Sequence, residues 1–263
     1  MSTAPLDITT ALDLSGRVAL VTGGTRGIGF SIAEQLLAAG ACVVVCGRTR
    51  PDVLPAVAGR SAEFLAADVR AADAAAALVE RTAALHGRLD AVVNNAGGSP
   101  DADAATVSTG FVDKVVALNM LAPFYVAQAA NRVMQAQPGG GAIVNIGSLS
   151  AHDPQPGTAA YSAAKAGLLM FTKALALEWA PLVRVNHITA GLVHTETAAA
   201  GHSGNDGTAV ASIIPMRRMA DPADIARTCL FLCSDLSAYL NGADIAVHGG
   251  GEVPGRYVIT RGT

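Results

Sequence analysis

Charged residues are scarce in this sequence. Asp, Glu, Lys and Arg together account for 15% of its 263 residues, whereas apolar residues account for 51%. The net charge is −3 and Lys and Arg form no cluster, so a nucleic-acid-binding surface is not expected. Such an apolar chain is not expected to be disordered, and part of its folded surface should be covered, most simply by identical subunits.

A long uninterrupted apolar run is also missing. The uncharged stretch 115–131 is the best candidate for a membrane span, but Asn119, Pro123 and Gln128 interrupt it. It is shorter than the about 20 residues that cross a bilayer, so we expect a buried or interface helix and no membrane partner. The N-terminus lacks a basic start followed by an apolar run, so no secretory signal is predicted.

Cysteine is sparse, with four residues in two pairs. Cys42 and Cys46 lie in a strand-like run, where residues four apart are too distant for a disulfide. Cys229 and Cys233 lie on an expected helix, and no His pair stands at ligand spacing to complete a metal site. The cysteines are therefore interpreted as small core residues, no metal is expected, and a reducing, cytoplasmic location is predicted.

Apolar, β-rich runs alternate with helical patterns along the whole chain. Continuous apolar strands separated by helices are typical of a parallel sheet covered on both faces. The expected fold class is therefore α/β, a single doubly wound parallel sheet (Rossmann fold) with helices on both faces. Strands are expected at residues 17–22, 41–46, 62–67, 89–94, 142–146, 183–188 and 244–247, and helices at residues 28–39, 71–86, 110–135, 159–180 and 222–234.

No internal repeat or linker divides the sequence, so residues 1–263 are expected to form one domain. The segment 192–215 differs from the rest of the chain. Between residues 195 and 212 it is rich in Ala, Gly, Ser and Asn, and it shows no strong periodicity. We predict that this segment is a mobile substrate loop.

A glycine-rich turn, Thr22-Gly23-Gly24-Thr25-Arg26-Gly27-Ile28-Gly29, joins the first expected strand to the first expected helix. Glycines let the backbone turn tightly and approach a pyrophosphate, which the positive N-terminus of a helix attracts. In this position between strand and helix, the turn is a strong signal for dinucleotide binding. Neither Lys-Ser nor Lys-Thr follows it, so a P-loop NTPase is not favoured.

Tyr161 and Lys165 are four residues apart on an expected helix, and Ser148 lies thirteen residues upstream. Positions i and i+4 share one helix face, so the lysine ammonium can lie beside the phenol. A nearby positive charge favours the phenolate, so we expect a lowered Tyr161 pKa and acid/base chemistry on an alcohol oxygen. Ser148 supplies a neutral hydroxyl for the same oxygen.

Together these motifs resemble the short-chain dehydrogenase/reductase family, from Leu14 to about Gly251. The family's glycine motif is matched by Thr22, Gly23, Gly27 and Gly29, and its Asn-Asn-Ala-Gly motif by residues 94–97. Its catalytic residues are matched by Asn119, Ser148, Tyr161 and Lys165. The resemblance implies that Tyr161 is the general acid/base, Lys165 lowers its pKa and binds the nicotinamide ribose, Ser148 orients the carbonyl, and Asn119 supports a water relay.

The end of the second strand indicates which dinucleotide is used. An acidic residue there would bind the ribose 2′-hydroxyl and select NAD, but this chain has Gly47-Arg48. Arg26 and Arg48 suit a 2′-phosphate, so the expected cofactor is NADP(H). The resemblance adds an adenine contact at Asp68-Val69 and a carboxamide contact at Thr195. The expected cofactor-binding residues are Gly23, Thr25, Arg26, Gly27, Ile28, Gly29, Arg48, Asp68, Val69, Asn95, Ala96, Gly97, Tyr161, Lys165 and Thr195.

The expected activity is hydride transfer between NADP(H) and a small-molecule carbonyl or alcohol. Two alternatives stay open: reduction of a 3-oxoacyl thioester within the same family, and a non-catalytic dinucleotide-binding sensor. The resemblance implies a homotetramer, or a homodimer. Ala190 and His248 replace the family's usual proline and aspartate, and these departures bear on loop order and assembly rather than on the catalytic set.

Overall fold

The computed structural model describes residues 7–195 and 208–254. Its centre is a seven-stranded sheet in the order β5-β2-β1-β6-β7-β8-β9, in which every neighbouring pair is parallel. The strands are β1 (Val18–Thr22), β2 (Cys42–Gly47), β5 (Glu63–Ala66), β6 (Ala91–Asn94), β7 (Gly141–Ile146), β8 (Val183–Ala190) and β9 (Asp244–Val247). The strand order reverses between β1 and β6, which creates the crevice where open α/β sheets bind ligands.

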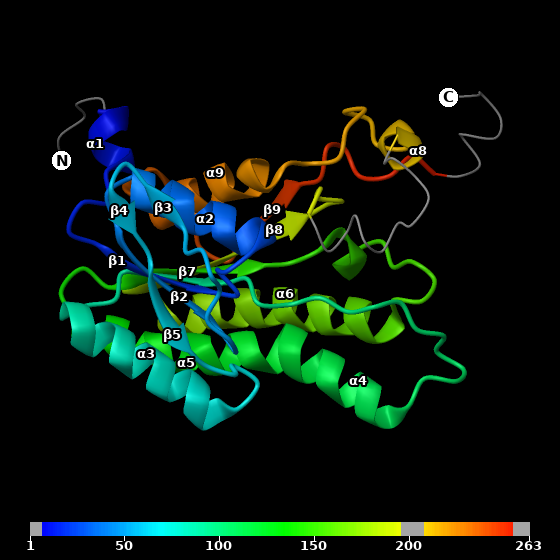
Figure 1. The fold of residues 1–263 in the computed structure, drawn as a ribbon, viewed down its shortest axis with the longest axis horizontal. Coiled ribbons are helices and arrows are strands. Elements are labelled where there is room, and N and C mark those ends of the chain that lie inside the picture. The colour runs from blue at the N-terminus through cyan, green and yellow to red at the C-terminus, as the bar shows by residue number, and fades with distance from the viewer. Residues whose placement is uncertain (1–6, 196–207, 255–263) are drawn as a thin grey trace.

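Helices cover both faces of the sheet, as the sequence predicts (Figure 1). One face carries α2 (Gly27–Ala38) and α9 (Pro222–Cys233), with the short α1 (Ile8–Leu12) beside them. The other face carries α3 (Ala72–His86), α5 (Ala122–Ala136) and α6 (Ala159–Trp179), with α4 (Thr109–Val116) ahead of α5. The expected doubly wound α/β fold is therefore confirmed.

Successive residues of each strand are buried on opposite faces of the sheet. In β1, Ala19 and Val21 pack in the core beneath α2 and α9, whereas Val18 and Leu20 pack in the core against α3 and α5. Both faces of the strand are thus apolar, which is why these strands appear as continuous apolar runs. All four cysteines are free thiols, and burial raises the pKa of Cys46 to about 11.

The helix predicted at 110–135 is interrupted by a π-helical turn, Ala117–Leu121. The Ala122 amide donates to the Ala117 carbonyl, five residues back. Pro123 has no amide hydrogen, so it cannot donate to the carbonyl of Asn119 four residues earlier. By length and hydropathy alone Thr109–Ala136 could cross a membrane, but here Val126 and Met134 are fully buried in the core between α5 and the sheet.

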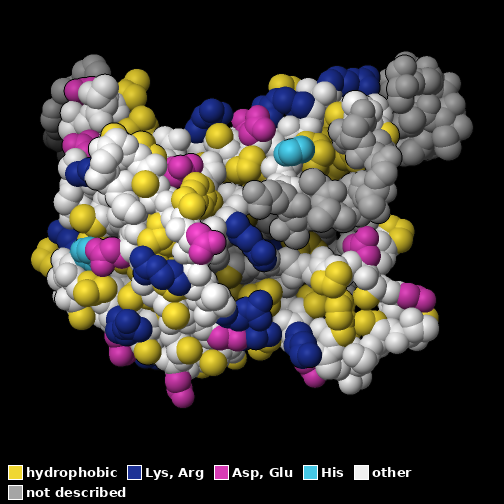
Figure 2. Space-filling view, viewed as in Figure 1, with side chains coloured by type: hydrophobic (Ala, Val, Ile, Leu, Met, Phe, Trp, Pro, Cys, Tyr) yellow, Lys and Arg dark blue, Asp and Glu magenta, His cyan; other side chains and the backbone are white. Residues whose placement is uncertain are grey.

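Several short elements were not predicted from the sequence. They are the helix α1, the hairpin of β3 (Ala56–Val57) and β4 (Arg60–Ser61), the 3-10 turns Leu149–Ala151 and Asp235–Ser237, and α8 (Thr208–Ser212). Of the predicted substrate loop 192–215, residues 196–207 lie outside the described residues. On the face seen in Figure 2, Lys and Arg side chains are interspersed with Asp and Glu.

Candidate active site

The glycine-rich turn is held against the end of β6 by side-chain hydrogen bonds. Thr22 Oγ1 accepts the amide hydrogens of Asn95 and Ala96, each at 3.0 Å. Asn95 Nδ2 in return donates to the carbonyls of Thr22 and Gly23, at 3.0 and 3.1 Å. The turn and the Asn-Asn-Ala-Gly segment therefore form one rigid unit at the carboxyl end of the sheet.

Three glycines are required in this turn, one by the space around it and two by their backbone conformation. A Cβ added at Gly29 would lie 2.4 Å from both Asn95 Nδ2 and the Gly23 carbonyl oxygen. Gly23 and Gly27 have φ of +62° and +53°, which side-chain-bearing residues rarely adopt. The backbone therefore presents an open cradle at the N-terminus of α2, the geometry that suits a pyrophosphate.

Two arginines lie next to the cradle in sequence, one in the glycine-rich turn and one at the end of β2. Arg26 precedes α2 and Arg48 follows β2, and both side chains are exposed. Neither forms an ion pair with any described residue. Asp68, by contrast, is bound by Arg70 at both carboxylate oxygens, and this hydrogen bonding lowers its pKa to about 2, with a smaller contribution from Arg48. Arg48 is therefore close to the predicted adenine contact and free to bind an anion.

The predicted catalytic side chains converge at the ends of β7 and α6. Lys165 is buried, and its Nζ donates to the Ile146 carbonyl at 2.8 Å and lies 5.7 Å from the Tyr161 ring centroid. The Ser148 hydroxyl lies close enough to the Tyr161 phenol to lower the pKa of that phenol. The structure thus brings Ser148, Tyr161 and Lys165 together, as the sequence predicts.

The expected lowering of the Tyr161 pKa is not found. Burial raises the pKa of Tyr161 above its usual range, and the nearby Ser148 hydroxyl offsets this only in part. Burial also lowers the pKa of Lys165, to about 8. The reason is desolvation: removing both groups from water favours their neutral forms, the phenol and the amine.

Asn119 lies beside the same lysine. Its fully buried side chain exchanges hydrogen bonds with the Gly98 backbone, with Oδ1 accepting at 2.8 Å and Nδ2 donating at 3.0 Å. A Cβ at Gly97 would lie 2.9 Å from Asn119 Oδ1 and 3.2 Å from Lys165 Nζ. Gly97 therefore permits the close approach of these two polar side chains.

The predicted carboxamide contact, Thr195, lies over the glycine turn, with its Cγ2 3.5 Å from a Cβ placed on Gly27. The two departures from the family pattern are adjacent in space. Gly191 follows Ala190 and packs against His248, whose Nδ1 accepts the Gly250 amide hydrogen at 3.2 Å. His248 thus provides a local acceptor of the kind an aspartate would provide.

A small cavity opens beside Tyr161. Its volume is about 230 Å³, and it lies between the loop at residues 99–107 and the N-terminal ends of α4 and α6. The residues around it carry no charged side chains: Ser99, Ala102, Ala104, Val107, Phe111, Val112, Gly157, Ala159, Ala160 and Tyr161.

A polar cluster at the far edge of the sheet is not among the predicted site residues. It is centred on Asp244, which binds His152, His187 and Thr189. A histidine inside the apolar strand run 183–190 was the available signal, since a buried imidazole needs a partner. Its partner is 57 residues away, so no local pattern identifies it.

A doubly wound sheet with a glycine cradle and a Ser-Tyr-Lys cluster at its carboxyl edge defines a dinucleotide-dependent enzyme architecture. The family model described as enoyl-(acyl carrier protein) reductase matches residues 23–252. The chain therefore belongs to the short-chain dehydrogenase/reductase family, whose members are oxidoreductases that use nicotinamide dinucleotides.

Individual relatives differ in their substrates. The chain is 38% identical to a D-threitol dehydrogenase of Mycolicibacterium smegmatis, covering 90% of this chain and 93% of the relative. It is 35% identical to a 3-oxoacyl-[acyl-carrier-protein] reductase of Chlamydia trachomatis, covering 90% and 98%. A solved structure from Beutenbergia cavernae, provisionally assigned as an NAD(P)-dependent gluconate 5-dehydrogenase and holding NADP at low occupancy, superposes with a TM-score of 0.85 at 37% identity, covering 91% and 98%.

Proposed function

We propose that this protein transfers hydride between NADP(H) and a carbonyl or alcohol, with Tyr161 as the general acid/base. The observation that carries the proposal is the joint placement of the Ser148 hydroxyl, the Tyr161 phenol and the buried Lys165 at the carboxyl edge of the sheet, next to the glycine cradle. A polar cluster of this kind is costly to bury unless it has a use.

The residues divide the reaction between them. A bound nicotinamide supplies or accepts the hydride. The raised pKa of Tyr161 keeps its proton in place, so in the reducing direction the phenol protonates the substrate carbonyl oxygen. Ser148 donates a second hydrogen bond to that oxygen. Lys165 binds the nicotinamide ribose and, as charge develops on Tyr161, stabilises the phenolate.

Asn119 completes the proton route in this proposal. Its side chain is fully occupied by Gly98 and Val115, so it holds the π-helical turn in place. Pro123 cannot donate to the backbone carbonyl of Asn119, and in this proposal that carbonyl binds a water that resupplies the proton through Lys165.

NADP(H) rather than NAD(H) is proposed on the two arginines. Arg26 lies in the glycine-rich turn and Arg48 follows β2, and both side chains are exposed and form no ion pair with a described residue. A guanidinium binds a phosphate bidentately, which makes it the preferred partner of a 2′-phosphate. NADP bound to the Beutenbergia cavernae relative supports this choice.

Reduction of a 3-oxoacyl thioester is the second candidate, favoured by the similarity to the Chlamydia trachomatis reductase. The two candidate activities are distinguished by comparing the rate of turnover of an acyl thioester with that of a free ketone or a sugar alcohol. A non-catalytic sensor is disfavoured, because nucleotide binding alone does not need a buried lysine beside a tyrosine and a serine.

We further propose that the chain works as one domain, in the cytoplasm, as a homotetramer or homodimer. The segment 192–215 is proposed to close over the substrate. Support for assembly comes from large apolar side chains on the outer side of α6, where Met170 and Leu177 are 62% and 84% exposed. Burying such side chains between subunits would remove them from water.

The test is Tyr161→Phe, with Tyr125→Phe as the matched control. Tyr125 is a half-buried tyrosine on α5 that packs edge-on against Phe124, away from Ser148. Loss of the phenol oxygen should lower kcat by about 10³-fold, within the range of general acid/base catalysis, and leave NADPH binding intact. The control should keep full activity. Normal turnover by Tyr161→Phe would contradict the mechanism.

A further inference from the structure

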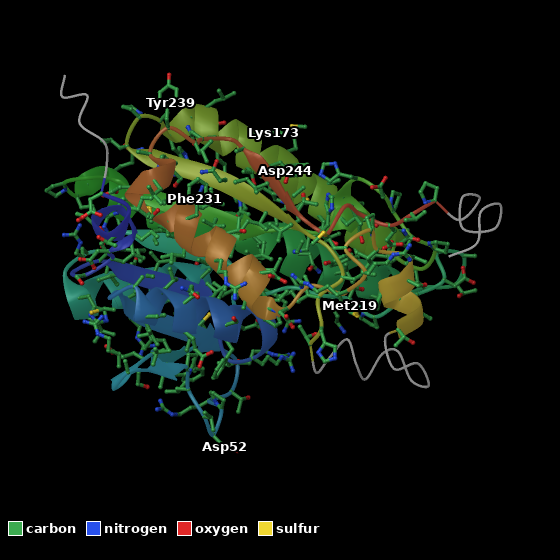
Figure 3. The ribbon with its side chains drawn as sticks, turned by 90° about the horizontal axis from the view of Figure 1, so that it is seen from above. Asp52, Lys173, Met219, Phe231, Tyr239 and Asp244 are labelled. Carbon is green, nitrogen blue, oxygen red and sulfur yellow. The ribbon has the colours of Figure 1, made fainter. Side chains whose placement is uncertain are left out.

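Asp244, labelled in Figure 3, is the first residue of the edge strand β9. Its carboxylate accepts three side-chain hydrogen bonds. Its Oδ1 accepts from His187 Nδ1 at 2.8 Å and from Thr189 Oγ1 at 2.7 Å, both on the neighbouring strand β8. Its Oδ2 accepts from His152 Nε2 at 2.9 Å. One carboxylate therefore joins two strands of the sheet to the loop that follows β7.

The protonation states in this cluster follow from its contacts. Burial raises the pKa of Asp244, but the hydrogen bonds from His187, Thr189 and His152 together outweigh it and hold the pKa well below its usual range. Burial lowers the pKa of His187, so this imidazole is neutral. An ionised carboxylate only accepts, so His187 carries its proton on Nδ1 and His152 donates from Nε2.

The two histidines contact the two ends of the turn that carries Ser148. A Cβ at Gly147 would lie 2.0 Å from both Cε1 and Nε2 of His187, so the backbone immediately before Ser148 rests on this imidazole ring. The 3-10 turn Leu149–Ala151 follows Ser148, and His152 ends it with an amide hydrogen bond to the Leu149 carbonyl. Asp244 thus holds the backbone before and after the catalytic hydroxyl.

We propose that Asp244, through His152 and His187, positions the Ser148 hydroxyl for catalysis. This inference rests on the proposed function, in which Ser148 orients the substrate carbonyl. The side chain of His152 is 43% exposed, so its hydrogen bond to Asp244 is the weaker and more adjustable of the two. His187 is fully buried and acts as the fixed support beneath Gly147. A small displacement of a positioned group lowers the rate strongly, because the reacting atoms lose their alignment.

His152→Ala is the principal test, because an exposed side chain can be removed without unfolding the protein. We expect kcat to fall about tenfold while the KM for NADPH changes by less than about twofold. His152→Gln, whose amide can donate from nearly the position of Nε2, should recover most of the lost rate. A general loss of stability would not be recovered by an amide.

A double-mutant cycle with Ser148→Ala decides whether the effect passes through Ser148. If His152 acts only by positioning this hydroxyl, His152→Ala should lower the residual rate of Ser148→Ala by less than about twofold. Equal tenfold effects in both backgrounds would overturn the proposal, and so would full activity of His152→Ala.

Hydrogen exchange separates this inference from the proposed function, because it needs no substrate. In Asp244→Ala and His152→Ala the peptide covering residues 148–153 should exchange at least about fivefold faster than in the wild type, whereas a peptide from α3 should not change. Unchanged exchange at 148–153 would overturn the positioning role. If the wild-type protein turned over no carbonyl or alcohol, the proposed function would be contradicted. The exchange of residues 148–153 would still test whether Asp244 and His152 hold this turn.

Discussion

The two halves of the active-site edge are built in different ways. On the β1–β2 side the cradle is made of backbone, with glycines where a Cβ would collide and exposed arginines that no described residue pairs. On the other side, the site is made of buried polar side chains. Lys165, His187 and Asn119 are each held by hydrogen bonds to other segments of the chain.

The two halves of the site are therefore encoded in the sequence in two different ways. A backbone cradle is encoded by local spacing, since a few glycines between a strand and a helix determine its path. A buried polar cluster is encoded by the packing of segments that are far apart in sequence, and it carries a desolvation cost. Substitutions should therefore act on the first half by steric collision and on the second half by electrostatics.

The largest effect is expected from Gly29→Ala. The new methyl group would lie 2.4 Å from Asn95 Nδ2 and from the Gly23 carbonyl oxygen, and the carbonyl belongs to backbone that cannot yield. We expect a loss of about 3 kcal/mol of stability, measured by denaturant unfolding, together with loss of NADPH binding. Gly110→Ala in α4 is the control, because its Cβ would meet no described atom within 4 Å, and it should be neutral or slightly stabilising. If Gly29→Ala were as stable as the wild type, steric collision would not be what constrains the glycine cradle.

A smaller effect, with a characteristic pH dependence, is expected from Lys165→Met. The pKa of Lys165 is lowered from 10.5 to about 8, so the folded state resists its protonation. The contribution of Lys165 to stability is therefore present above pH 10.5 and is lost as the pH falls through 8. Methionine has no such titration.

The free energy of unfolding of wild type relative to Lys165→Met should accordingly rise by about 2 kcal/mol between pH 8 and 10.5. Parallel denaturation curves of the two proteins across this range measure the difference. A difference independent of pH would mean that the buried ammonium is better solvated than its surroundings indicate. Turnover should be lost in Lys165→Met at every pH.

The smallest effect is expected from Arg48→Ala. Removing an exposed guanidinium should leave stability unchanged and weaken NADPH binding about tenfold, or about 1.4 kcal/mol, with no change for NADH. Arg50→Ala is the matched control, since its guanidinium lies over the Phe64 ring, 5.7 Å from the centroid. Fluorescence titrations with both dinucleotides measure the selectivity. Equal losses for NADPH and NADH would show that Arg48 does not bind a 2′-phosphate.

Most of the fold was predictable because its strands are continuous apolar runs and its helices have a helical period. The ends of α3, α6 and β9 lie within about one residue of the predicted ones, whereas the interruption at Ala117–Leu121 was not foreseen. That turn lies within an otherwise continuous helical pattern, and only the backbone geometry around Pro123 reveals it. The hairpin at residues 56–61 was also missed, because two-residue strands are too short to show a pattern.

The doubly wound fold and the family follow from the order of apolar runs, helical patterns and motifs along the chain. The glycine cradle and the Tyr161-Lys165 pair follow from spacings of a few residues. The direction of the Tyr161 pKa shift and the contact of His152 and His187 with Asp244 depend on how distant segments pack together. Burial and the register between β8 and β9 determine both, and neither is visible in the periodicity of a single chain segment.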